Sequence, residues 1–103
     1  MINVTKGKIL LESRSDLEFE NGGVLNPACI EKDGIVHMFY RAVRKRNFST
    51  IGYCQLKNNQ VIYRSDTPVL IPEYLYERMG MEDPRITLID GKYYMLYTAY
   101  DGL

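Results

Sequence analysis

The chain has 103 residues, of which 46% are hydrophobic and 25% are charged, as expected of one small globular domain or a piece of a larger one. Thirteen basic and thirteen acidic residues cancel, so no overall field favours nucleic acid or an anionic membrane as a partner. The first residues lack an apolar signal core and no apolar run approaches ~18 residues. From these features we expect a cytoplasmic protein.

The cysteines and the histidine give no sign of a metal site. Cys29 and Cys54 each lie in an apolar, strand-like run without a Cys or His partner at ligand spacing, so we expect two buried free thiols. His37 has no partner at metal or triad spacing, and we expect a structural role for it. Because no phosphate-loop, dinucleotide-binding or zinc-protease motif is present, the sequence predicts no cofactor and no metal.

In chain order, short runs of apolar, β-branched and aromatic residues alternate with turn signals. The expected strands cover residues 8–11, 24–32, 35–43, 49–56, 61–64, 86–89 and 92–97. Asp33-Gly34 and Asp90-Gly91 separate neighbouring runs, and such a pair is the strongest short-range signal for a β-hairpin. Residues 65–82 form a connector in which a single helical turn is possible near residues 73–78. The pattern predicts an all-β chain.

An internal repeat relates the two hairpins. Residues 26–43 align without a gap to residues 83–100, with an offset of 57 residues. The Pro, Asp-Gly, Met, Tyr and Ala positions of the two segments coincide. Four strands per unit at this period indicate antiparallel four-stranded blades of a β-propeller or a related repeated sheet.

The repeat divides the single partial domain (residues 1–103) into a first blade at 24–64, a connector at 65–82 and the first hairpin of a second blade at 83–103. Repeat units bury their faces against neighbours, so fewer than about three are seldom stable alone. We therefore expect a part of a longer protein or a subunit that completes a ring as a homo-oligomer.

Equivalent positions of successive blades face one central funnel, which makes Asn26 and Asp83 candidates for binding a hydroxyl-rich ligand. The proline after Asp83 disfavours the α conformation, so we expect Asp83 to be extended at a strand entrance. A structural turn role is the alternative for both residues. Arg41 is either a surface residue, which the strand pattern alone favours, or a pocket residue. Residues 44–46 are better explained as a solvated basic loop than as a phosphate or nucleic-acid site.

The segment Gly80-Met81-Glu82-Asp83-Pro84-Arg85, with the strands that follow it, closely resembles glycoside hydrolase family 130. This family comprises β-mannoside phosphorylases and β-1,2-mannosidases. Asn26-Pro27-Ala28, Phe39-Tyr40-Arg41 and residues 49–53 fit the first blade of the same family. The resemblance covers the chain from about Val24 onward, and it implies the first blade and the start of the second of a five-bladed propeller roughly three times as long.

The resemblance also implies roles for individual residues. Asp83 corresponds to the catalytic acid, Asn26 and Arg41 to residues that hold the mannosyl unit, and Glu82 to a residue beside the bound sugar. The implied reaction is inverting cleavage of a β-mannoside oligosaccharide, in which inorganic phosphate, as co-substrate, attacks the anomeric carbon and Asp83 supplies a proton through a mannose hydroxyl. The family's phosphate clamp comes from later blades. A non-catalytic carbohydrate-binding or structural propeller fragment that oligomerises is the alternative.

Overall fold

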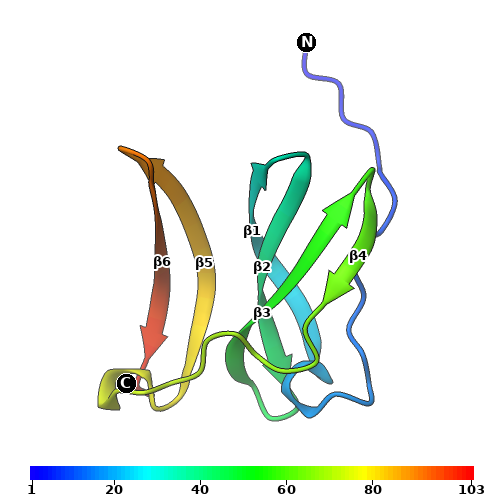
Figure 1. Ribbon diagram of the computed structural model, residues 1–103. Helices are drawn as coiled ribbons and strands as arrows, with labels where there is room; N and C mark the ends of the chain where they lie inside the picture. Colours follow the sequence, from blue (N-terminus) through cyan, green and yellow to red (C-terminus); the bar gives the residue numbers. More distant parts are fainter.

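The computed structural model describes all residues, 1–103, as six strands and two short 3-10 helices (Figure 1). The elements in chain order are η1 (Glu18–Glu20), β1 (Gly23–Lys32), β2 (Ile35–Arg44), β3 (Phe48–Lys57), β4 (Gln60–Arg64), η2 (Leu75–Glu77), β5 (Gly80–Ile89) and β6 (Lys92–Tyr100). The all-β prediction is confirmed, and η2 occupies the helical turn expected near residues 73–78. With three residues each, η1 and η2 are far too short to span a lipid bilayer.

Both Asp-Gly pairs form the predicted hairpin turns. Asp33 and Gly34 have φ of 53° and 78°, and Asp90 and Gly91 have φ of 48° and 76°. Two consecutive positive φ values match a type I′ turn, whose twist suits the right-handed twist of the strands that it joins. The two Asp-Gly pairs therefore fix the β1–β2 and β5–β6 registers.

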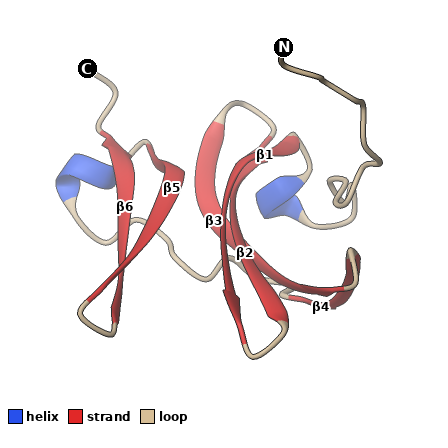
Figure 2. Cartoon of the chain, turned by 90° about the horizontal axis from the view of Figure 1, so that it is seen from above, coloured by secondary structure: helices blue, strands red, loops and turns tan.

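The strands form an antiparallel β1–β4 meander and a β5–β6 hairpin beside it (Figure 2). One parallel pair, Ser49 with Gly80, joins the hairpin to β3. The hairpin begins at Gly80, three residues before the expected boundary at 83. The predicted strand at residues 8–11 is wrong: this segment pairs with no strand, and Leu11 instead packs against the core.

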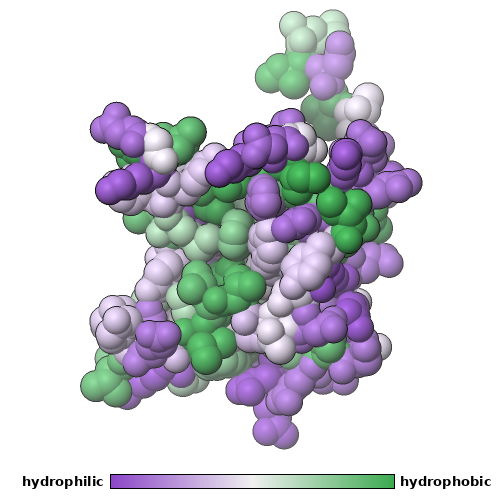
Figure 3. Space-filling view, in the orientation of Figure 1, coloured by the Kyte–Doolittle hydropathy of each residue, from purple (hydrophilic) through white to green (hydrophobic).

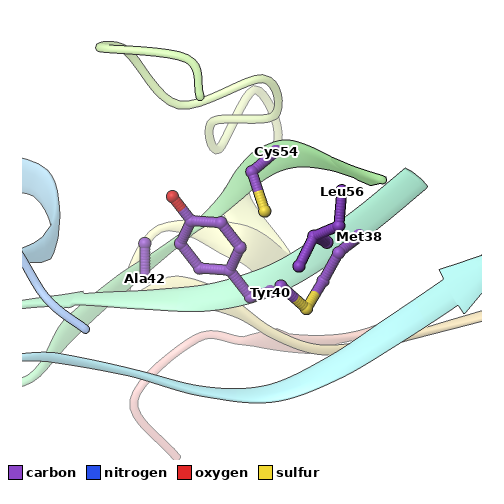
Figure 4. Packing of buried hydrophobic residues seen from close by; sticks show 5 residues of the cluster. All are labelled: Met38, Tyr40, Ala42, Cys54 and Leu56. Carbon is purple, nitrogen blue, oxygen red and sulfur yellow. The ribbon is translucent and has the colours of Figure 1, made fainter. Parts of the chain in front are cut away.

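The core of the meander lies on one face of β2 and β3 (Figure 4). Its buried side chains are Met38, Tyr40, Ala42, Cys54 and Leu56. Both cysteines are free, and Cys54 is buried, which raises its thiol pKa to about 11. The prediction that Cys29 is buried is wrong. In β1 its neighbour Ala28 is buried, and because successive strand residues point to opposite faces, Cys29 points outward.

The repeat extends to a buried glutamate before each hairpin. Glu20 in η1 and Glu77 in η2 occupy equivalent positions and are 0% and 2% exposed. Tyr40 donates its hydroxyl hydrogen to Glu20 at 2.9 Å, and Tyr97, the repeat equivalent of Tyr40, donates to Glu77. Each glutamate therefore ties a connecting segment to the second strand of its own hairpin.

The network around Glu77 predicts a pH-dependent contribution to stability. The pKa of this carboxyl is lowered, first because the Glu73 backbone N–H donates to it and next because of the Tyr97 hydroxyl. A lowered folded-state pKa means that the contribution is present above the unfolded pKa, about 4.3, and is lost as the pH falls through the folded value. We expect Glu77→Gln to melt several degrees below the wild type at pH 7, with a smaller gap at pH 3.

Glu73→Gln is the matched control, because Glu73 is exposed and its backbone N–H is unchanged. Its melting temperature should stay close to that of the wild type at both pH values. A Glu77→Gln gap that is the same at pH 7 and pH 3 would show that the charge of Glu77 does not contribute.

Apolar side chains also reach the surface of the molecule. In Figure 3 they gather in the middle of the face shown. On β6, Tyr94, Leu96 and Tyr100 are 50%, 74% and 40% exposed. The repeat equivalents of Tyr94 and Leu96 are His37 and Phe39, which are half-buried. The face of the second hairpin is therefore less covered than the same face of the first.

Candidate active site

Two β-bulges position Asn26 and Asp83. The pairing of β1 with β2 shifts between Leu25 and Ala28, and the pairing of β5 with β6 shifts between Glu82 and Arg85. In each bulge an Asn-Pro or Asp-Pro pair stands opposite one tyrosine. Proline suits this position because it has no N–H to donate to a neighbouring strand.

The predicted extended conformation of Asp83 is wrong. Asp83 and Asn26 have φ of 52° and 47°, and both lie inside strands, not at strand entrances. The following proline disfavours the right-handed α region, whereas Asn and Asp tolerate positive φ better than other non-glycine residues. The bulges turn both side chains out of the regular alternation of the strands.

These two repeat-equivalent side chains meet. Nδ2 of Asn26 donates to Oδ1 of Asp83 at 2.8 Å across 57 residues of sequence. The Asp83 side chain is 37% exposed, and its second carboxylate oxygen has no hydrogen-bond donor within the protein. The convergence expected from the repeat is confirmed, and it leaves one carboxylate oxygen available to a ligand.

Arg41 belongs to the same cluster. Its side chain is 15% exposed, so the surface position favoured by the strand pattern is wrong. Nη2 of Arg41 donates to Oε1 of Glu82 at 2.8 Å, and Nη1 lies 3.8 Å from Oδ1 of Asp83. The contact between Nη1 and Asp83 is an ion pair, and its distance is too long for a hydrogen bond. Nη1 therefore keeps its donors free beside the Asp83 carboxylate.

The structure brings together all four predicted site residues: Asn26, Arg41, Glu82 and Asp83. Glu82 is 20% exposed and contacts Arg41, so it serves here as the counter-ion of the guanidinium. None of the four lines a surface cavity, although cavities of up to about 360 Å³ exist elsewhere. The cluster is open, and it offers carboxylate and amide oxygens beside guanidinium donors. Such a set can bind several hydroxyl groups at once.

The other polar candidates are not part of this cluster. Arg44 ends β2 and stacks on Phe48, and Lys45 and Arg46 lie in the turn that follows; all three residues are exposed. This arrangement supports the solvated-loop interpretation of the basic run. His37 contacts the Tyr53 hydroxyl through Nδ1 at 2.7 Å and stacks on the Tyr53 ring, as expected for a structural residue.

Sequence reasoning missed one residue of the cluster, Ser49. Its hydroxyl accepts a hydrogen bond from Nε of Arg41 at 2.9 Å. Ser49 and Arg41 lie on neighbouring strands, β3 and β2, and a long side chain can reach a diagonal neighbour on the same face. A signal existed in the sequence: only a short loop separates the expected strands at residues 35–43 and 49–56, so pairing these strands as a hairpin would place Ser49 close to Arg41.

Comparisons with known proteins show which family this chain resembles in sequence and fold. Residues 8–103 match the family model described as beta-1,4-mannooligosaccharide phosphorylase. The chain is 40% identical over 108 residues to a beta-1,2-mannobiose phosphorylase, and 37% identical over 100 residues to a 1,2-beta-oligomannan phosphorylase, both from Thermoanaerobacter sp. strain X514. The matches cover 92% and 90% of this chain but 36% and 34% of the relatives. The chain thus spans about a third of their length.

Solved structures give the same result for the fold. A glycosyl hydrolase from Bacteroides ovatus superposes with a TM-score of 0.81 at 25% identity, covering 90% of this chain and 32% of that protein. A second structure represents the GH130 family of mannoside phosphorylases, which contains glycoside hydrolases that target beta-1,2 mannosidic linkages in Candida mannan. It superposes with a TM-score of 0.76 at 26% identity, covering 90% of this chain and 32% of that protein. The repeated strands are thus part of a five-bladed β-propeller, and the chain belongs to glycoside hydrolase family 130.

Proposed function

We propose that the chain supplies the proton donor and part of the sugar-binding subsite of an enzyme that cleaves β-mannosides with inversion. The observation that carries the proposal is the meeting of Asn26 and Asp83 at 2.8 Å beside the Arg41 guanidinium. The relatives are phosphorylases of β-1,2-linked mannosides, which supports phosphate as the nucleophile and an oligomannoside as the substrate.

In the proposed reaction, a phosphate oxygen attacks the anomeric carbon while the bond to the leaving oxygen breaks. The proton that the leaving oxygen gains originates from Asp83, and the products are mannose 1-phosphate of inverted configuration and the shortened oligosaccharide. Inverting hydrolases use an acid and a base that activates water, whereas phosphate is already nucleophilic, so the inverting phosphorolysis needs only the acid from the protein. Asn26 holds one oxygen of that acid, and Arg41 and Asn26 offer the hydrogen-bonding groups that hold the mannosyl unit.

The test is a transplantation. Residues 1–103 replace the matched N-terminal third of the Thermoanaerobacter β-1,2-mannobiose phosphorylase, and mannose 1-phosphate is measured with β-1,2-mannobiose and phosphate. We expect turnover within about tenfold of the parent, because the transplanted blade carries the four site residues. A folded chimaera without phosphorolysis or hydrolysis would contradict the proposal.

A second candidate is a non-catalytic propeller fragment that associates with other copies. The exposed Tyr94, Leu96 and Tyr100 on β6 favour it, because propeller blades bury this kind of face against a neighbour. This candidate predicts that light scattering shows a defined oligomer of the 103-residue chain. It also predicts that the oligomer has no activity toward mannosides in the presence of phosphate. A monomer would count against this candidate.

A further inference from the structure

We infer that Ser49 is a positioning residue that sets the direction of the Arg41 guanidinium and its distance from Asp83. The inference rests on the proposed sugar-binding role of Arg41, and it adds a residue that does not itself contact the sugar. Ser49 is fully buried in β3. Its hydroxyl accepts a hydrogen bond from Nε of Arg41 at 2.9 Å.

The three nitrogens of the guanidinium face three different partners. Nε donates to Ser49, Nη2 donates to Glu82, and Nη1 lies 3.8 Å from Asp83. A guanidinium is a planar fork, so two fixed nitrogens determine where the third points. The Ser49 and Glu82 bonds together therefore aim Nη1 toward the Asp83 carboxylate.

The backbone of Ser49 also contacts β5, the strand that carries Asp83. Ser49 pairs with Gly80, the first residue of β5. A Cβ at Gly80 would come within 3.1 Å of both N and O of Ser49, and Gly80 has φ of 135°. Such a close backbone approach requires glycine at this position. Glu82 and Asp83 follow two and three residues later, so Ser49 contacts both Arg41 and the start of the strand that carries Glu82 and Asp83.

The neighbouring residue Thr50 provides a matched control. Thr50 is 6% exposed, and its hydroxyl is buried without a hydrogen-bond partner. Thr50→Val and Ser49→Ala each remove one buried hydroxyl from adjacent positions of β3. Successive strand residues point to opposite faces, and the Ser49 hydroxyl is the one bonded to Arg41.

The experiment measures exchange of the Arg41 Nε–H hydrogen with solvent by ¹⁵N NMR in the 103-residue chain, with the signal assigned by its loss in Arg41→Lys. We expect exchange at least tenfold faster in Ser49→Ala and unchanged in Thr50→Val. The wild-type rate in folded Ser49→Ala would overturn the inference. If Ser49→Ala does not fold, Ser49→Cys replaces it: a sulfur accepts more weakly, so faster exchange supports the inference and an unchanged rate overturns it.

A second measurement separates this inference from the proposed function. In the chimaera with β-1,2-mannobiose phosphorylase, Ser49→Ala is expected to raise KM about tenfold, while Thr50→Val leaves KM unchanged. Faster Nε–H exchange with an unchanged KM would support the positioning by Ser49 and overturn the sugar-binding role of Arg41. Unchanged exchange would overturn the positioning whatever happens to KM.

Discussion

Asp83→Asn is expected to lower turnover of β-1,2-mannobiose by about 10³-fold in the chimaera that carries residues 1–103, the scale of losing a general acid. Asparagine has nearly the same shape and tolerates the positive φ of this position, 52°. Its amide oxygen can still accept the hydrogen bond from Asn26. The variant therefore removes the proton and the charge but preserves the bulge. Release of mannose 1-phosphate, followed with saturating phosphate, gives the measurement.

Asp90→Asn is the matched control for this experiment. Asp90 also has a positive φ, 48°, and lies at the exposed turn after the same strand. Its replacement changes the net charge equally but removes no group of the cluster, so turnover should stay within about twofold of the parent. Equal activity in the Asp83→Asn and Asp90→Asn chimaeras would show that Asp83 is not the proton donor.

The positions of Asn26 and Asp83 could be predicted from the sequence because the repeat keeps its register. Asp-Gly turns fix the two hairpins, and hairpins with the same register place equivalent residues at equivalent points. The conformation of Asp83 could not be predicted in the same way. A proline restricts its predecessor but does not reveal a bulge, which depends on how β5 pairs with β6.

The burial of the charged residues Glu20, Glu77 and Arg41 was not predicted from the sequence. Glu20 closely follows a mostly polar stretch, residues 12–18, and Glu77 lies in the connector, where acidic residues are ordinarily solvated. A signal existed: Glu20 and Glu77, like Tyr40 and Tyr97, occupy equivalent positions in the repeat. A repeated acid paired with a repeated tyrosine indicates a shared structural contact. The burial of Arg41 depends on β5 and Glu82, so the pattern of β2 alone could not show it.

Glu20→Ala is expected to destabilise the fold by about 3 kcal/mol, because it leaves a partly buried arginine without its counter-ion. Glu20 is fully buried, and its Oε1 accepts from Nη2 of Arg64, whose side chain is 15% exposed. Its Oε2 accepts from the Tyr40 hydroxyl at 2.9 Å. The substitution therefore also leaves a buried hydroxyl unpaired. Urea unfolding followed by circular dichroism provides the free energy of unfolding.

Two variants decide whether the buried charge is the cause. Glu18→Ala removes an 81% exposed glutamate of the same η1 helix, which lies 3.7 Å from Arg44, and it should cost less than about 0.5 kcal/mol. The double variant Glu20→Gln/Arg64→Met leaves no unpaired charge, so it should lose less stability than Glu20→Ala alone. If the double variant is the less stable of the two, packing around Glu20 and Arg64, and not their charges, anchors η1 to the first blade.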